Sequence, residues 1–314
     1  MLAIAALILP LFSLILIGYV AAKLLRLPIE GLAWMNAFVV WVALPPLFFN
    51  LLSVTPVEEF GNGTFFVTTT AATFLIMAVC FCVARVFRKS DTQASTIQAL
   101  ASGYGNIGYL GPPLAVAAFG PAAGVPVALI FCFENAMHFT LAPLMMAAGD
   151  NQRKNPLRLV AGIVTRIVFH PFILATLVGV AAAFTGFRPA APVQQVLDSL
   201  ANAAAPCALF VMGVTAALRP LKRVPIELTW LIPFKLIVHP LLVWFAVTTF
   251  TDVDDVWLYS AVLLAALPTA TNVFVLAQQY TVWEERASSA VVLSTLLSIP
   301  TITLVLYLLT NSGT

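Results

Sequence analysis

Three glycines in the stretch SGYGNIGYLGPPLAVAAFG, residues 102–120, have a spacing that in other proteins binds phosphate. Gly103, Gly105 and Gly108 match G-x-G-x-x-G, which holds a dinucleotide when it follows a β-strand and when an acidic residue lies about 20 positions later. About 20 residues past Gly108 the chain instead reads PVALIFCF, and Glu134 lies deep in this apolar sequence. We therefore interpret the spacing as accidental and expect no dinucleotide cofactor.

Two pairs of titratable side chains lie inside apolar sequence. Lys235 and His239 are four residues apart in IPFKLIVHPLL, and Glu134 and His138 are four apart in FCFENAMHFTLAP, so each pair shares one helix face. A lysine inside a membrane span is costly and usually faces a polar path. Lys235 could be a built-in cation, pair with substrate or exchange a proton, or it could only snorkel to an interface. His239 could be structural, and the Glu134–His138 pair could relay protons or only hydrogen-bond across one turn.

The sequence lacks the patterns of intramembrane enzymes. It has no G-x-S for a rhomboid-type serine nucleophile and no H-E-x-x-H for a metalloprotease, and its Asp cluster at 252–255 lies in a predicted loop. Cys80 and Cys82 are too close for a C-x-x-C site. We therefore expect no catalytic residue, no cofactor and no metal, and a receptor that moves no substrate has no feature in its favour.

The composition is that of a membrane protein, which needs helices to position these side chains. Of 314 residues, 61% are hydrophobic and 9% are charged, against about a quarter charged in ordinary globular domains. One span needs about 20 apolar residues. Polar punctuation divides the chain into ten apolar segments: 3–24, 32–53, 64–87, 93–119, 122–148, 159–185, 194–217, 227–250, 256–280 and 286–310. We therefore predict an all-α polytopic membrane protein and no nucleic-acid partner.

The basic residues predict the orientation of these spans. Lys and Arg gather in alternate connections, and the exceptions are Arg188 on the opposite side and Lys235 inside a span. Because cytoplasmic loops carry the excess of Lys and Arg, we expect both termini outside the cytoplasm. An even number of spans agrees with this orientation.

The prolines of the two halves pair at nearly constant separations. The separations are 161 residues for Pro10 with Pro171 and for Pro45 with Pro206, 156 for Pro112 with Pro268, and 157 for Pro143 with Pro300. We predict one five-span repeat in residues 1–150 and another in residues 151–314. Since five is odd, the second repeat would be inverted, as in secondary transporters. The alternative is chance, because Pro and Gly are frequent in membrane helices.

Corresponding spans of the two halves carry helix breakers. The glycine cluster predicts that a helix from about residue 94 stops near 107 and restarts at Pro112, a residue suited to a first helical position. Pro268 breaks the other span, where Thr269, Thr271 and Asn272 are expected to cap the restarted helix. A helix break leaves backbone N–H and C=O groups without helical partners, and a membrane tolerates such groups only where they contact protein or a water-filled cavity.

Two restarted helices could together bind an anion. A helix N-terminus carries partial positive charge, and inverted symmetry would bring the two breaks together near the midplane. Asn106 and Asn272 would then supply amide donors for a carboxylate. Corresponding broken helices are the best pointer from sequence to a transporter's binding site.

The motifs GNIGYLGPPL, ALPTATNVFVLAQQY, VALPPLFF and KLIVHPLL resemble the auxin efflux carrier family, including bacterial members often labelled malonate carriers. The resemblance covers essentially the whole chain. It implies ten helices in two inverted five-helix repeats, with helices four and nine crossing at prolines, as in sodium/proton antiporters and bile-acid symporters. It also implies a scaffold part, a moving transport part, and elevator-like transport of an organic acid across the bacterial inner membrane.

Residue roles follow from the resemblance by position. Asn106 matches the asparagine of helix four that contacts substrate, and Pro112 and Pro268 match the crossover. Together with the residues that the sequence itself indicates, the expected substrate contacts are Asn106, Gly111, Pro112, Asn135, Pro268, Thr271 and Asn272, and the expected coupling residues are Glu134, His138, Lys235 and His239.

The sequence does not assign the exact substrate, the oligomeric state or the coupling ion. The central connection is only GDNQRKNPLR, which removes the phosphorylation control of the plant carriers and leaves auxin itself doubtful as substrate. The resemblance makes a homodimer plausible. A sodium- or proton-coupled symporter or antiporter with different cargo is the alternative, although an antiporter would use paired carboxylates where this chain has Asn106 and Asn272.

Overall fold

The computed structural model describes residues 2–26, 28, 30–149, 156–218 and 224–311. Most of the central connection GDNQRKNPLR lies outside these residues. The helices of the first half are α1 (Leu2–Leu25), α2 (Gly31–Ala37), α3 (Leu44–Ser53), α4 (Gly63–Cys82), α5 (Thr92–Gly103), α6 (Ile107–Phe119) and α7 (Gly124–Ala148). Those of the second half are α8 (Pro156–Val168), α9 (Pro171–Thr185), α10 (Ala191–Leu218), α11 (Leu228–Pro233), α12 (His239–Phe250), α13 (Asp255–Ala266), α14 (Thr271–Tyr280) and α15 (Glu284–Asn311).

Short non-α turns join several of these helices into longer rods. Three are π-helical, at Phe38–Ala43, Val83–Phe87 and Phe234–Val238, and two are 3-10 helices, at Val57–Gly61 and Pro121–Ala123. A π turn inserts one extra residue and re-aims the side chains that follow, which is why such turns are frequent at functional sites.

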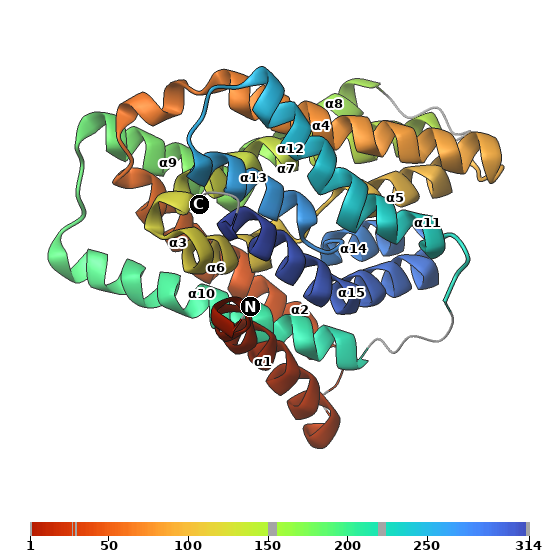
Figure 1. Cartoon of the computed structure of the whole chain (residues 1–314), viewed down its shortest axis with the longest axis horizontal. Coiled ribbons are helices and arrows are strands. Elements are labelled where there is room, and N and C mark those ends of the chain that lie inside the picture. Colours follow the sequence, from red (N-terminus) through yellow and green to blue (C-terminus); the bar gives the residue numbers. More distant parts are fainter. Residues whose placement is uncertain (1, 27, 29, 150–155, 219–223, 312–314) are drawn as a thin grey trace.

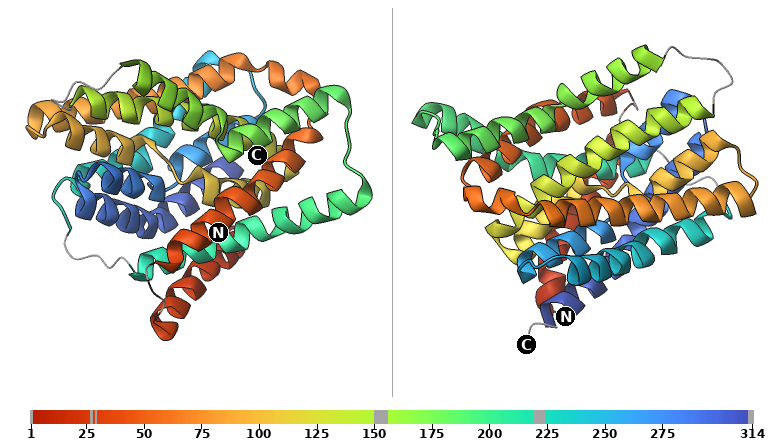
Figure 2. Two further views of the ribbon diagram at one scale, coloured as in Figure 1. Left: turned by 180° about the vertical axis from the view of Figure 1, so that it is seen from behind. Right: turned by 90° about the horizontal axis from the view of Figure 1, so that it is seen from above.

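Six helices of the described chain are long and apolar enough to cross a membrane, and four shorter apolar helices lie in the remaining predicted segments. The six are Gly31–Ser53, Gly63–Phe87, Pro121–Ala148, Ala191–Leu218, Leu228–Phe250 and Glu284–Thr310. The chain is therefore a helical polytopic membrane protein. The beginning of α1 and the end of α15 lie on the same side of the molecule (Figure 2), as an even number of spans requires.

Four helices form one packed group. In Figure 1, α10 runs along the lower side of the molecule beside α1, and α3 packs on both α9 and α10. The α1–α10 approach is so close that a Cβ at Gly18 would collide with the Phe210 carbonyl oxygen, and one at Gly213 with the Ile15 carbonyl oxygen. Glycine is required at both positions because only its backbone permits this approach.

The same contact recurs between α9 and α3. A Cβ at Gly179 would lie 3.3 Å from the Phe49 carbonyl oxygen. Gly179 follows Gly18 by 161 residues, and Phe210 follows Phe49 by the same number, which is also the separation of the first two proline pairs. Equivalent residues thus make equivalent contacts in the two halves.

The first break lies within the glycine cluster but before the predicted stop near residue 107, and the predicted restart at Pro112 is wrong. α5 ends at Gly103, and α6 begins at Ile107 and continues through Pro112 and Pro113 to Phe119. Each proline removes one helical hydrogen bond, yet the helix persists around them. The break is held instead at residues 104–106 by bonds to the second broken helix, so tertiary pairing overrides the local preference of proline for a first turn.

The second break lies at Pro268 as predicted, but the predicted side-chain caps are wrong. Ala270 precedes α14 and has no side chain that can cap. Thr269 Oγ1 donates to the Ala101 carbonyl oxygen at 2.7 Å, and Asn272 Nδ2 donates to the Tyr104 hydroxyl at 2.9 Å. These side chains join the two broken helices rather than cap one of them.

The two half-helices before the breaks correspond at a separation of 163 residues, not 156. α5 and α13 each have 12 residues. Asp91 Oδ1 accepts from the Ala94 amide at 2.6 Å, and Asp254 Oδ1 accepts from the Trp257 amide at 3.0 Å. Gly105 therefore corresponds to Pro268, and the predicted equivalence of Pro112 with Pro268 is wrong.

Candidate substrate-binding site

The two breaks lie against each other as short antiparallel segments. Gly105 and Thr269 form a bridge, the Asn106 amide donates to the Pro268 carbonyl oxygen at 2.8 Å, and the Ala270 amide donates to the Tyr104 carbonyl oxygen at 2.9 Å. Each break thereby satisfies backbone groups that the other has freed, which a buried position demands. The two breaks thus meet in the structure as a bonded pair of segments.

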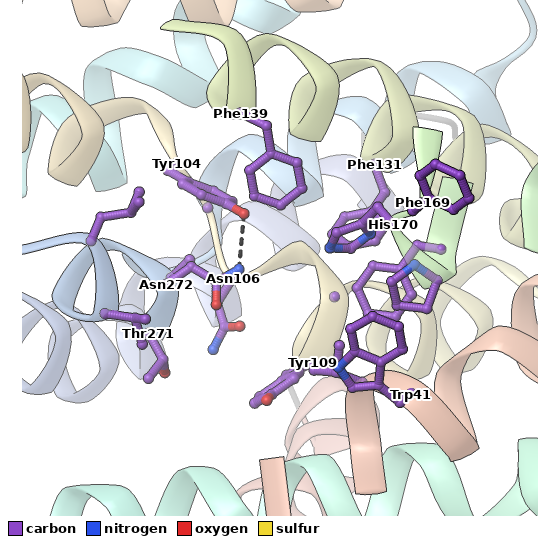
Figure 3. A pocket seen from close by; sticks show the side chains of 18 of the residues that line it. Trp41, Tyr104, Asn106, Tyr109, Phe131, Phe139, Phe169, His170, Thr271 and Asn272 are labelled. Atoms are coloured by element: carbon purple, nitrogen blue, oxygen red, sulfur yellow. Dashed lines mark hydrogen bonds between the residues drawn. The ribbon is translucent and has the colours of Figure 1, made fainter. Parts of the chain in front are cut away.

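A cavity of about 550 Å³ lies beside this crossing. Both breaks line it, and Figure 3 shows Tyr104, Asn106, Thr271 and Asn272 on one side of the cavity, across from a wall of aromatic side chains. That wall consists of Trp41, Tyr109, Phe131, Phe139, Phe169, His170 and Phe172. The cavity thus has one end of amides and hydroxyls and one aromatic end.

Asn106 lies at the polar end and keeps its amide nearly free. The side chain is 5% exposed, and among the described residues its Nδ2 donates only to the Met212 sulfur, at 3.3 Å. A thioether is a weak acceptor, so a carboxylate oxygen would be a much better partner. Asn106 also precedes α6 without capping it, which leaves N–H groups of the first turn free of a side-chain cap.

Asn272 and Asn135 are joined by one tyrosine. The Tyr104 hydroxyl donates to Asn135 Oδ1 at 2.6 Å and accepts from Asn272 Nδ2 at 2.9 Å. Asn272 and its neighbour Thr271 line the cavity, whereas Asn135 lies behind Tyr104 and does not.

Three other predicted contacts also lie outside the cavity wall. Gly111 and Pro112 are buried in α6 beyond its first turn, and Pro268 contributes its carbonyl oxygen to the bond with Asn106. The aromatic wall was not predicted. With 23 Phe in the chain, no local signal separates the cavity-lining residues from those that face lipid.

Three of the four candidate coupling residues, Glu134, Lys235 and His239, are joined by hydrogen bonds near the crossing. Lys235 lies in the π turn before α12 and is 1% exposed. Its Nζ donates to the Ala265 carbonyl oxygen at 2.9 Å, in the last turn of α13, and lies 3.1 Å from His239 Nδ1. The snorkelling alternative for Lys235 is therefore wrong.

A chain of hydrogen bonds leads from Lys235 to Glu134. Thr73 Oγ1 donates to Glu134 Oε1 at 2.7 Å and lies 3.0 Å from His239 Nε2. Since the hydroxyl has one proton, it must accept from His239 Nε2, and His239 Nδ1 then accepts from the lysine. All donors point the same way, from ammonium to carboxylate. Thr73, the link on α4, was not predicted.

His138 does not belong to this chain. Its ring is fully buried and stacks on Tyr104, with 4.0 Å between ring centroids and 4° between the planes. Glu134 bonds to Thr73 instead of to the His138 side chain. The expected pairing of Glu134 with His138 across one turn is wrong.

Comparison with known proteins agrees with this architecture. The family model described as "Membrane transport protein" matches residues 3–306. A Rhizobium meliloti protein named "Putative malonate transporter" is 52% identical over 310 residues, which is 99% of this chain and 97% of that protein. An "Uncharacterized transporter" of Methanothermobacter thermautotrophicus is 24% identical over 93% of this chain and 94% of its own length.

A mouse "Lysosomal cholesterol signaling protein" is 30% identical over 195 residues, covering 59% of this chain and 21% of the mouse protein. The match of the family model runs through both broken helices and nearly to the end of the chain. The chain belongs to the membrane transport protein family, the family of the auxin efflux carriers.

Proposed function

We propose that this protein is a secondary transporter that moves a small organic anion across the bacterial inner membrane by an elevator-type alternating-access mechanism. The observation that carries the proposal is the convergence of two helix N-termini and two asparagine amides on one cavity. Uncapped helix N-termini attract anions. A carboxylate that takes both amides would also replace the weak Asn106–Met212 contact.

The proposed scaffold is ten spans in two inverted repeats, residues 1–150 and 151–314. The equivalent contacts of Gly18 and Gly179 and the equivalent caps Asp91 and Asp254 support this symmetry. In this arrangement α1, α3, α9 and α10 form the static scaffold, and the helices around the crossing form the transport part. Both termini lie outside the cytoplasm.

Within the described residues, few of the hydrogen bonds tie the proposed transport part to the scaffold and to α2, which continues into α3. Besides Asn106 with Met212, the Tyr109 hydroxyl donates to Asn36 Oδ1 at 2.7 Å, and Cys132 Sγ lies 2.8 Å from Thr176 Oγ1. The rest of this interface is largely aromatic and aliphatic packing. Such an interface suits an elevator, because apolar surfaces can slide without leaving many buried donors unpaired.

Two substrate classes fit different observations. The malonate name of the Rhizobium relative supports a small dicarboxylate, and the aromatic end of the cavity supports an auxin-like acid with an apolar body. Both would place one carboxylate at the amides. The cavity is large for malonate alone, so water would accompany a small dicarboxylate.

Lys235 is the proposed source of charge at the crossing. Its ammonium group binds the last turn of α13 and lies close to Gly105 of the other break, so it occupies the place where a coupling cation would lie. The one-way chain to Glu134 provides bonded donors and acceptors for a proton. These contacts favour proton coupling over sodium coupling.

Uptake into proteoliposomes tests the proposal. We expect labelled malonate or labelled phenylacetate to accumulate under an imposed proton gradient and not under a sodium gradient alone. Accumulation under sodium alone would replace proton coupling by sodium coupling. If neither acid nor any other of a panel of mono- and dicarboxylates enters under any gradient, the proposed function is wrong.

A further inference from the structure

We propose that Tyr104 is a positioning residue for the substrate site and that His138 is the platform that holds it. Tyr104 orients the Asn272 amide, and His138 contributes the face of its ring rather than a proton. The inference rests on the proposed function, because it concerns the same cavity.

The hydroxyl of Tyr104 fixes the orientation of Asn272. Its single proton goes to Asn135 Oδ1, so its lone pairs accept from Asn272 Nδ2, the bond drawn as a dashed line in Figure 3. Asn272 therefore keeps its second N–H for a ligand. An asparagine that rotated freely would have to be ordered by the substrate, at the expense of affinity.

Tyr104 joins several segments that form the proposed site. It lies in the first break, its carbonyl oxygen bonds the Ala270 amide of the second break, and its hydroxyl reaches Asn135 on α7 and Asn272 on α14. One side chain thus ties the start of α14 to α7. Its ring must hold one orientation for both hydroxyl bonds to persist.

The His138 ring restricts the Tyr104 ring. The two rings are parallel to within 4° at 4.0 Å, so the histidine covers one face of the tyrosine. Offset and stacked aromatic pairs contribute beyond simple burial.

The surroundings of His138 do not suit a proton carrier. Its ring lies near the Glu134 carbonyl oxygen of its own helix, but neither ring nitrogen makes a hydrogen bond of good geometry within the described residues. A proton carrier needs bonded neighbours on both sides. His239 has such neighbours in Lys235 and Thr73, and the chain through it bypasses His138.

Three variants separate a platform from a proton carrier. Tyr104→Phe keeps the stack and removes the hydroxyl, so the KM for uptake should rise roughly three- to tenfold, the equivalent of one neutral hydrogen bond, with Vmax retained. His138→Ala removes the platform and should raise KM to a similar degree. His138→Phe restores a flat ring and should recover most of the affinity lost in His138→Ala.

The measurement is uptake of labelled malonate or phenylacetate, whichever the wild type accumulates, by the full chain in proteoliposomes across a range of pH. Tyr19→Phe is the matched control, since Tyr19 is 41% exposed on α1 and does not line the cavity. A monodisperse profile in detergent shows that each variant is folded.

The outcomes distinguish this inference from the proposed function. If the wild type accumulates neither acid, the proposed function is wrong and the positioning roles fall with it. If the wild type transports but Tyr104→Phe keeps the wild-type KM, the role of Tyr104 is wrong. If His138→Phe loses transport like His138→Ala, or loses its pH dependence, the ring nitrogens matter and the platform role is overturned.

Discussion

The two broken helices have similar backbone arrangements but different side chains at their breaks. α5 and α13 have equal lengths and equivalent aspartate caps, and each break bonds to the other. The first break itself carries Tyr104 and Asn106 into the cavity, whereas at the second break Thr269 bonds to Ala101, and the cavity is lined by Ala270 and by Thr271 and Asn272 of α14. The similar backbones build the crossing, and the different side chains put the less constrained amide of the proposed site, Asn106, in the first break.

The Lys235 ammonium group lies close to both breaks but contacts them differently. Lys235 donates to the last turn of α13, before the second break, and a Cβ at Gly105 in the first break would lie 3.2 Å from the lysine Nζ. Glycine fits the first break best, because a side chain there would crowd both the ammonium group and the Leu264 carbonyl oxygen. The second break can use Pro268, whose missing N–H is not needed there.

Removal of Lys235 should have the largest effect. Lys235→Ala leaves Glu134 in a buried chain without its cation, and losing one partner of a buried charge network costs about 3–5 kcal/mol. We expect uptake to fall by about 100-fold or more at every pH. The measurement is uptake in proteoliposomes beside Lys23→Ala, an exposed lysine on α1. Uptake near the wild-type level in Lys235→Ala would remove the lysine from the mechanism.

Loss of the Asn106 amide should show most clearly that the two breaks differ in their contact with substrate. Asn106→Ala removes a hydrogen bond to a charged ligand, worth about 1.5–3 kcal/mol, so affinity should fall roughly 10- to 150-fold. Thr269 lies in the second break and bonds to Ala101, so Thr269→Ala should change affinity far less. Titration of both variants with labelled acid checks this. Equal losses would contradict the direct contact with substrate that is proposed for Asn106.

A methyl group at Gly105 should destabilise the crossing. A Cβ there would meet the Leu264 carbonyl oxygen and the Lys235 Nζ, each at 3.2 Å, and such overpacking costs about 1–3 kcal/mol. The melting temperature of Gly105→Ala in detergent should fall, whereas Gly31→Ala should show no packing penalty, because nothing lies within 4 Å of its Cβ. A wild-type melting temperature for Gly105→Ala would mean that the ammonium group is farther away.

Removal of the aspartate caps should have the smallest effects, and the two local losses of helix stability should be equal. Asp91→Ala and Asp254→Ala each remove one side-chain cap, worth about 0.5–2 kcal/mol. Hydrogen exchange should rise locally at the first turns of α5 and α13, near Ala94 and Trp257. Faster exchange in only one of the two variants would break the equivalence at 163 residues.

Much of the fold was predictable because a membrane imposes simple rules on a sequence. Apolar length and the polar residues between apolar segments located most of the helices, and Pro268 located the second break. The restart of α6 was mispredicted because proline was assigned its local preference. Bonds between Asn106 and Pro268, which are 162 residues apart, outweigh that preference.

The candidate site was predictable only where one element carries the signal. Asn106 and Asn272 lie at the breaks themselves, and the Lys235–His239 contact joins residues one turn apart. Thr73 was missed because a threonine in a membrane helix usually bonds its own backbone. Its bonds to α7 and α12 depend on how three helices pack, which no local pattern encodes.

The most direct test of the central claim is equilibrium binding of labelled malonate and labelled phenylacetate to the purified wild type and to Asn106→Ala. The cavity at the crossing predicts saturable binding of at least one acid to the wild type and a loss of about tenfold or more in affinity for Asn106→Ala. Equal affinity of the two proteins for the acid that binds would contradict the account, because the carboxylate would then lie elsewhere.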